Sequence, residues 1–160
     1  MIYKILTFNY LITIGIASWI AAQAIKSLIF IFRNKRINFK TLSGAGGMPS
    51  AHSALVCSVA VGTAHKYGLS SPYFSFAFTL AVIVMYDAMG VRRAAGEQAK
   101  AINSMQEYLK KNRCALPDGD EYFKNMVTGL NESLGHTPVE VAAGMALGIL
   151  IAVLSIIWVH

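Results

Sequence analysis

Long apolar stretches separated by short polar ones dominate the hydropathy pattern of the chain. The first runs from Ile5 to Ile25 without a charged residue and continues toward Phe32. About 20 such residues in a helix cross the roughly 30 Å hydrocarbon core of a bilayer. Three more apolar stretches predict further helices over Pro49–Tyr67, Tyr73–Val91 and Thr137–Val159. The pattern therefore predicts an all-α polytopic membrane bundle with about four transmembrane helices.

The pattern changes between Arg92 and Gly135, where charged residues become frequent. Ala94–Arg113 has the spacing of an amphipathic helix, and Tyr122–Leu134 predicts another short helix. This stretch is too polar to span a membrane, so we expect a polar helical insertion over residues 94–134, in water or at the membrane surface. Its acidic cluster could hold a cation, but a solvated turn is the expected structure of these residues, Asp118, Asp120 and Glu121.

Composition supports a membrane protein rather than a nucleic-acid-binding one. Hydrophobic residues make up 55% of the 160 residues and charged residues only 14%, against about 25% charged in typical soluble domains. The net charge of +6 does not form a basic surface stripe, because the basic residues collect between apolar stretches. We therefore expect one integral membrane domain over residues 1–160, with membrane lipids and no nucleic acid as partners.

The basic residues also predict an orientation. A short loop after the first helix carries Arg33, Lys35, Arg36 and Lys40, and such loops favour the cytoplasmic side. The turn at Ser70 would then lie outside, both termini would face outward, and the polar insertion would be cytoplasmic.

A glycine-rich stretch over residues 44–54 is the first candidate for chemistry. Its glycines let backbone amides approach a ligand, and Pro49 suits the first turn of a helix, whose N-terminus favours an anion. Ser50 adds a hydroxyl, and His52 adds a group that transfers protons near neutral pH. The alternative is a connector that caps a helix.

A second candidate begins at His136. Thr137, Pro138 and Glu140 have the spacing of a capping box, with threonine as N-cap and glutamate three residues into the helix. Glu140 could instead accept the Nδ1 proton of His136 and leave Nε2 free as a nucleophile. One carboxylate can serve both tasks, so the two interpretations do not exclude each other.

Cations are expected near both candidates. Lys26 and Arg33 lie seven residues apart on one helical face, and Arg92 and Arg93 follow Asp87 at the end of the third helix. Ionisable groups at membrane depth are usually functional, although Lys26 could also extend its amine to the interface. Two histidines among several cations favour a phosphoryl-transfer site.

Three motifs together resemble the divergent PAP2 family, membrane relatives of type 2 phosphatidic acid phosphatases and vanadium haloperoxidases. The resemblance runs from about Gln23 to Gly148, and its motifs lie at Gly46–Ala54, Asp87–Gly96 and Leu134–Val141. The wider superfamily uses KxxxxxxRP, PSGH and SRxxxxxHxxxD motifs. Here Asn34 replaces the proline, Ala51 replaces the glycine, and Glu140 stands for the aspartate. The insertion separates the arginine from His136.

The resemblance implies hydrolysis of a phosphate ester without a metal or other cofactor. His136 would attack phosphorus, supported by Glu140, and His52 would act as general acid and then general base. The phosphate oxygens would be held by Lys26, Arg33, Ser50, the Gly47 and Met48 amides, and Arg92 or Arg93. Asp87 could brace the arginines, although no superfamily motif assigns it a role.

Several functions remain open on the sequence. The leading one is a phosphatase of the bacterial cytoplasmic membrane, with phosphatidylglycerophosphate, phosphatidic acid or a polyprenyl pyrophosphate as substrate. Superfamily membrane enzymes usually have more crossings, so a homodimer is a candidate assembly. The alternative is a non-catalytic protein that binds anionic lipid headgroups or a protein partner. A CDP-alcohol phosphotransferase is rejected, because Asp87 has no second aspartate in its helix to hold metal ions.

Overall fold

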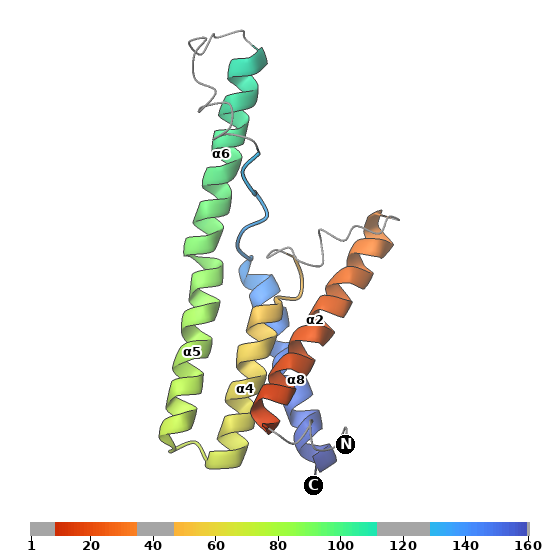
Figure 1. Ribbon diagram of the computed structural model, residues 1–160, viewed down its shortest axis with the longest axis vertical. Coiled ribbons are helices and arrows are strands. Elements are labelled where there is room, and N and C mark those ends of the chain that lie inside the picture. The colour runs from red at the N-terminus through yellow and green to blue at the C-terminus, as the bar shows by residue number, and fades with distance from the viewer. Residues whose placement is uncertain (1–8, 35–46, 112–128, 160) are drawn as a thin grey trace.

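The computed structural model describes residues 9–34, 47–111 and 129–159 (Figure 1). These residues form the helices α2 (Tyr10–Asn34), α4 (Ala51–Tyr67), α5 (Pro72–Met89), α6 (Val91–Lys111) and α8 (Pro138–Val159). The described ranges contain no β-strand, and the helices match the predicted apolar stretches closely. The prediction of a helical membrane bundle is confirmed.

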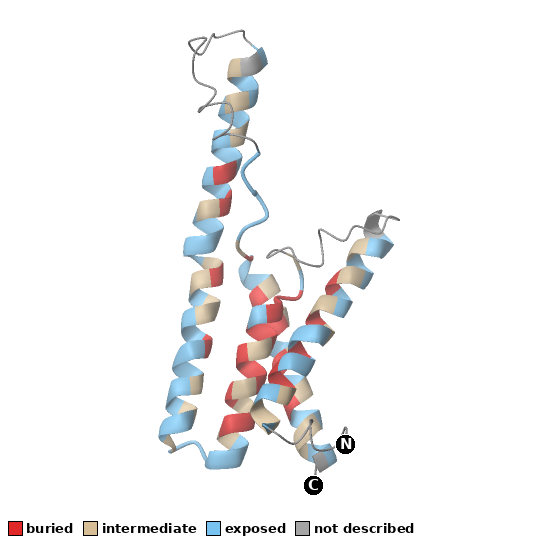
Figure 2. Cartoon of the chain, in the orientation of Figure 1, coloured by how far each residue is buried: buried red, intermediate tan, exposed pale blue. Residues whose placement is uncertain are grey.

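Helix α4 lies at the centre of the bundle and packs against α2, α5 and α8 (Figures 1 and 2). Its buried positions are mostly small residues, among them Ala51, Ser53, Ala54 and Ala60. Small side chains let neighbouring backbones approach closely, which is how helices associate in lipid. This composition therefore explains why α4 can contact three helices at once.

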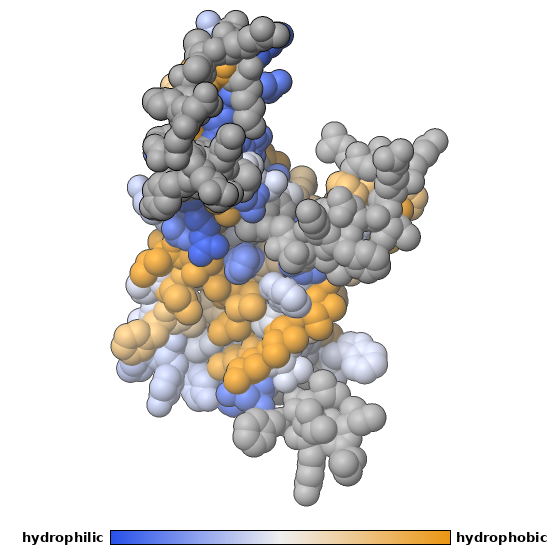
Figure 3. Space-filling view, turned by 45° about the horizontal axis from the view of Figure 1, so that its top comes forward, coloured by the Kyte–Doolittle hydropathy of each residue, from blue (hydrophilic) through white to orange (hydrophobic). Residues whose placement is uncertain are grey.

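The surrounding helices carry the large apolar side chains on their outer faces. Three stretches are long and apolar enough to cross a membrane: Tyr10–Phe32, Pro72–Leu109, which contains α5, and Pro138–Trp158. Figure 3 shows hydrophobic side chains over the bundle and hydrophilic ones on α6. Helix α4 has only 17 residues, and its neighbours cover much of its surface, so it adds a fourth, interior helix to the membrane bundle.

The described helices of the bundle begin and end at two opposite ends, apart from α6 (Figure 1). The start of α2 and the end of α8 lie at one end, whereas the N-termini of α4 and α8 lie at the other, beside the C-terminus of α5 (Figure 1). Helix α6 continues from α5 beyond this second end, because backbone hydrogen bonds cross the junction at Gly90. Twenty-one residues extend it by about 30 Å.

Two sequence predictions need correction. Pro49 is expected from the sequence in the first turn of α4, but Ser50 is the N-cap and the helix begins at Ala51, so Pro49 precedes the helix. The reason is that the Ser50 hydroxyl accepts a hydrogen bond from the Ser53 amide, which satisfies a first-turn donor. Of the short helix predicted to end at Leu134, residues 129–134 are irregular, because they bond to α6 instead.

The rest of that predicted helix, residues 122–128, lies outside the described residues. The acidic cluster at Asp118, Asp120 and Glu121 also lies outside them.

Two glycines bring α8 into backbone contact with α4. A Cβ atom at Gly144 would collide with the Ser50 carbonyl, and one at Gly148 would collide with the Ala54 carbonyl. The Ser50 amide also donates a 3.0 Å hydrogen bond to the Glu140 carbonyl. This close contact fixes the N-termini of the two helices side by side.

We expect Gly148→Val to destabilise the protein, because the added side chain must push α8 away from α4. Overpacking of this kind costs about 1–3 kcal/mol, measured as the free energy of unfolding in detergent. The matched control is Ala146→Val, which adds volume on an exposed face of the same helix. Equal stability of the two variants would show that the glycine contact is unimportant.

Candidate active site

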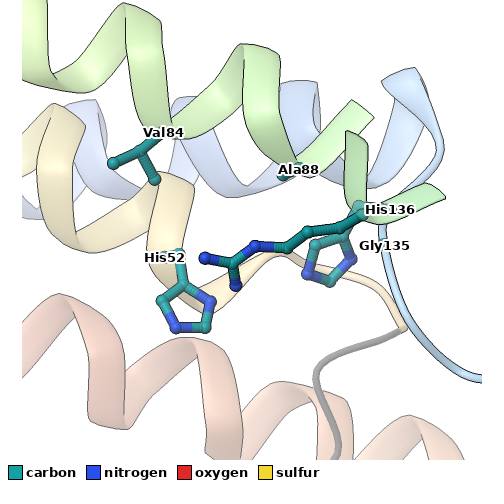
Figure 4. Close-up of a pocket in the computed structure, with 6 residues that line it drawn as sticks. His52, Val84, Ala88, Gly135 and His136 are labelled. Carbon is teal, nitrogen blue, oxygen red and sulfur yellow. The ribbon is translucent and has the colours of Figure 1, made fainter. Parts of the chain in front are cut away.

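The two candidate histidines meet at a small pocket at the end of the bundle where α4 and α8 begin. Its lining comes from α4, α5, the start of α6 and the segment before α8, namely His52, Val84, Ala88, Arg92, Gly135 and His136. Figure 4 shows the rings of His52 and His136 at this pocket, beneath α5. Residues 84 positions apart in the chain therefore contribute to one site.

Among the described residues, one ring nitrogen of His136 has a polar partner and the other has none. Its side chain is only 4% exposed, and its Nδ1 atom lies 3.2 Å from Glu140 Oε2. Its backbone amide donates a 2.9 Å hydrogen bond to the Ala88 carbonyl of α5. The Nε2 atom is buried and has no hydrogen-bond partner among the described residues. A ring held at Nδ1 with an unpaired Nε2 is the arrangement that a nucleophilic histidine requires.

Glu140 makes the contacts that both interpretations of the sequence require. Its Oε2 atom accepts a 2.9 Å hydrogen bond from the Thr137 amide as well as contacting His136. The Thr137 hydroxyl in turn accepts a 3.3 Å bond from the Glu140 amide, which completes the capping box. Helix initiation and orientation of the imidazole therefore depend on the same carboxylate.

Burial is the main influence on the protonation of His136. It lowers the pKa of His136 below the usual 6.5, and the hydrogen bond and charge of Glu140 oppose this by raising it. The positive charges of Lys26 and Arg92 lower the pKa further. The imidazole is therefore neutral at neutral pH, which leaves the Nε2 lone pair available.

One arginine of the pair faces the site. Arg92 lines the pocket, and its Nε atom lies 2.6 Å from Asp87 Oδ2. Arg93 does not line the pocket, although its backbone packs against Gly135. Asp87 thus braces Arg92, in the supporting position suggested for it. The side chain of Arg33 lies outside the described part of the structure.

Lys26 reaches the same region from α2. It is 5% exposed, and its charge acts on His52, His136 and Glu140. Its methylene carbons lie against Gly47, which has a positive φ of 95°. A buried cation so close to two histidines is costly in a membrane protein unless it has an anionic partner.

The remaining predicted phosphate ligands lie just before α4. Ser50 is fully buried, and its hydroxyl accepts hydrogen bonds from the amide and the hydroxyl of Ser53. Met48 is exposed beside it. Their position at the N-terminus of α4 suits an anion, and their role in binding one stays a prediction.

Sequence reasoning missed part of the pocket wall. Val84 and Ala88 line it on α5, eight and four residues before Arg92, which is the spacing of one helical face. That periodicity across the α5–α6 junction could have identified them. Ser53 does not line the pocket, but its hydroxyl donates a hydrogen bond to the Ser50 hydroxyl one helical turn before it, a contact that sequence reasoning also missed.

Similarity to known proteins extends over most of the chain. The profile of the "Divergent PAP2 family" matches residues 7–151. The chain is 38% identical over 148 residues to the uncharacterized membrane protein YuiD of Bacillus subtilis (strain 168), a match that covers 89% of this chain and 91% of that protein. No solved structure shows significant similarity to the chain.

Proposed function

Because the chain belongs to the divergent PAP2 family of membrane proteins, we propose that it is a lipid phosphatase that acts through a phosphohistidine on His136. The observation that carries this proposal is the state of the His136 ring. Nδ1 lies against Glu140, whereas Nε2 is buried and unpaired among the described residues. A purely structural histidine buried in this way would normally have a partner on both nitrogens.

In the first step, the Nε2 lone pair of His136 attacks phosphorus. An N–P bond forms as the bond from phosphorus to the ester oxygen breaks, and His52 gives its proton to the departing oxygen. The phosphorylated imidazole keeps its Nδ1 proton and carries a positive charge, which Glu140 stabilises.

In the second step, His52 removes a proton from water and the resulting hydroxide attacks phosphorus. The N–P bond breaks, its electron pair returns to Nε2, and inorganic phosphate leaves. His52 is protonated again and the site is ready for the next substrate. One lipid phosphate and one water thus give one lipid alcohol and one phosphate.

The cations hold the transferring phosphoryl group. Lys26 and Arg92 approach from α2 and α6, and the N-terminus of α4 adds its backbone amides. Charge stabilisation is usually the largest catalytic contribution in phosphoryl transfer, since the protein does little covalent chemistry on that group.

The substrate is proposed to be a lipid phosphate monoester or pyrophosphate. The pocket lies at the end of a bundle whose outer faces are apolar, so the acyl or prenyl chains can remain in the membrane. The basic residues that follow α2 in the sequence favour a cytoplasmic site in a bacterial membrane, which suits phosphatidylglycerophosphate or phosphatidic acid better than an external polyprenyl carrier.

Phosphate release from these three lipids tests the proposal, with the full chain in detergent and a chelator present. We expect chelator-resistant release from at least one of them. Release that needs an added divalent cation would contradict the histidine mechanism. If all three lipids bind and none is hydrolysed, the protein is a binder of anionic headgroups instead.

The pH dependence of kcat/KM should reflect His136. Catalysis requires the neutral imidazole, so activity falls as pH drops through the pKa of His136, and burial places that fall below pH 6.5. Glu140 raises this pKa, hence Glu140→Gln should move the acid limb to lower pH, while the glutamine carbonyl can still accept a hydrogen bond from Nδ1–H. The wild type, assayed with the same lipid, controls for titration of the substrate. An acid limb that moves to higher pH would contradict the assignment.

A further inference from the structure

Residues 129–136 deliver His136 to the pocket, yet they form no helix or strand. They run along α6 and the end of α5, and Figure 1 shows this segment beside α6 before it enters α8. Most of these side chains are exposed, so the segment has no core of its own. Its position must depend on specific contacts with the helix.

Asn103 makes the contacts at the far end of this segment. Its Nδ2 atom donates to the Leu130 carbonyl at 2.9 Å and to Glu132 Oε1 at 2.7 Å. Its Oδ1 atom accepts from the Leu130 amide at 3.1 Å. One side-chain amide therefore satisfies both backbone groups of Leu130, and among the described residues it is the main polar link between α6 and the segment.

Two glycine contacts continue the attachment toward the pocket. A Cβ at Gly96 would lie 2.5 Å from the Leu134 carbonyl, and one at Gly135 would collide with the Arg93 backbone. Gly135 also has a φ of 84°, which other residues rarely adopt. The series ends where the His136 amide bonds to the Ala88 carbonyl. Contacts at residues 103, 96, 93 and 88 thus follow one side of the continuous helix.

We propose that Asn103 is a positioning residue, which fixes the segment on α6 and so keeps His136 in the pocket with Nε2 aimed at the phosphoryl group. This rests on the proposed function. It also gives the polar insertion a role: α6 is a rigid support for the loop that carries the nucleophile. Asn103 itself touches no reacting atom.

The experiment compares Asn103→Ala with wild type, using the full chain in detergent. Diethyl pyrocarbonate modifies accessible neutral histidines, and peptide mass spectrometry follows each histidine separately. We expect His136 to be modified several-fold faster in Asn103→Ala, whereas His65, at the other end of α4, should keep its rate. The matched control is Ser104→Ala, an exposed neighbour on the same helix, which should leave the His136 rate at the wild-type value.

Steady-state kinetics test whether the positioning by Asn103 affects catalysis. A misplacement of 1 Å can reduce a rate about 100-fold, so we expect Asn103→Ala to lower kcat by about 10-fold with little change in KM. The phosphate-binding cations remain in place in this variant. A structural defect without positioning would reduce the amount of active protein and leave the His136 modification rate of the folded fraction unchanged.

A disulfide between α6 and the segment should restore the attachment that the Asn103 side chain provides in the wild type. In a Cys114→Ser background, the pair Asn103→Cys and Leu130→Cys would join α6 to the segment when oxidised. We expect slow His136 modification and high kcat in the oxidised protein, and both to be lost on reduction. A His136 modification rate unaffected by Asn103→Ala would overturn the positioning role, whether or not the wild type hydrolyses lipid phosphates. Absence of hydrolysis by a wild type with protected His136 would instead overturn the proposed function.

Discussion

Replacing His136 by alanine is expected to lower kcat for lipid phosphate hydrolysis by at least about 1,000-fold, because the N–P bond can no longer form. Loss of a covalent nucleophile has effects of this size or larger in hydrolases, and the residual rate comes from binding and charge stabilisation. The measurement is phosphate release under saturating lipid, with the amount of folded protein matched between samples.

His65→Ala is the control for this variant. His65 lies near the C-terminus of α4, at the end of the bundle away from the pocket, so its loss should leave kcat close to the wild-type value. A His136→Ala protein that retains a tenth of the activity or more would exclude His136 as the nucleophile. The phosphatase mechanism would then need a different attacking group.

The second large effect is expected at Arg92. Arg92→Ala should reduce kcat/KM by about 100- to 1,000-fold, the typical loss when one donor to a developing negative charge is removed. Arg92 lines the pocket and is braced by Asp87 at 2.6 Å, so its guanidinium is already oriented before substrate binds.

Arg93→Ala is the natural comparison, since it removes the same charge one residue away. Arg93 does not line the pocket, and we expect its loss to change kcat/KM only slightly. Similar losses of kcat/KM in both variants would show that the net positive charge at this end of the bundle matters more than the orientation of the Arg92 side chain.

The helices could be predicted because membrane spanning imposes a simple physical requirement on sequence. Uncharged stretches of about 20 residues have few alternatives to a helix in lipid, and α2, α5 and α8 accordingly lie close to the predicted positions. The sequence predicted the ends of the helices less accurately than their positions. Pro49 and Ser50 are both start signals, and the hydrogen bond that the Ser50 hydroxyl accepts from the Ser53 amide makes Ser50 the N-cap.

Some contacts of the candidate site could likewise be predicted from the sequence, whereas others could not. Glu140 and His136 are four residues apart, so local geometry was enough to predict their contact. The choice between Arg92 and Arg93 depended on how α6 is rotated after Gly90, and one residue turns a helix by about 100°. The attachment of residues 129–134 to Asn103 is a contact between segments 27 residues apart, which no local pattern encodes.

Detection of the phosphohistidine tests the central claim most directly. The full-length protein would be mixed with excess lipid phosphate, quenched in alkali within one turnover, and digested for mass spectrometry, because phosphohistidine survives alkali and decays in acid. We predict a phosphate group on the peptide that contains His136, absent from His136→Ala. A wild-type protein that releases phosphate rapidly without any phosphorylated His136 would contradict the account.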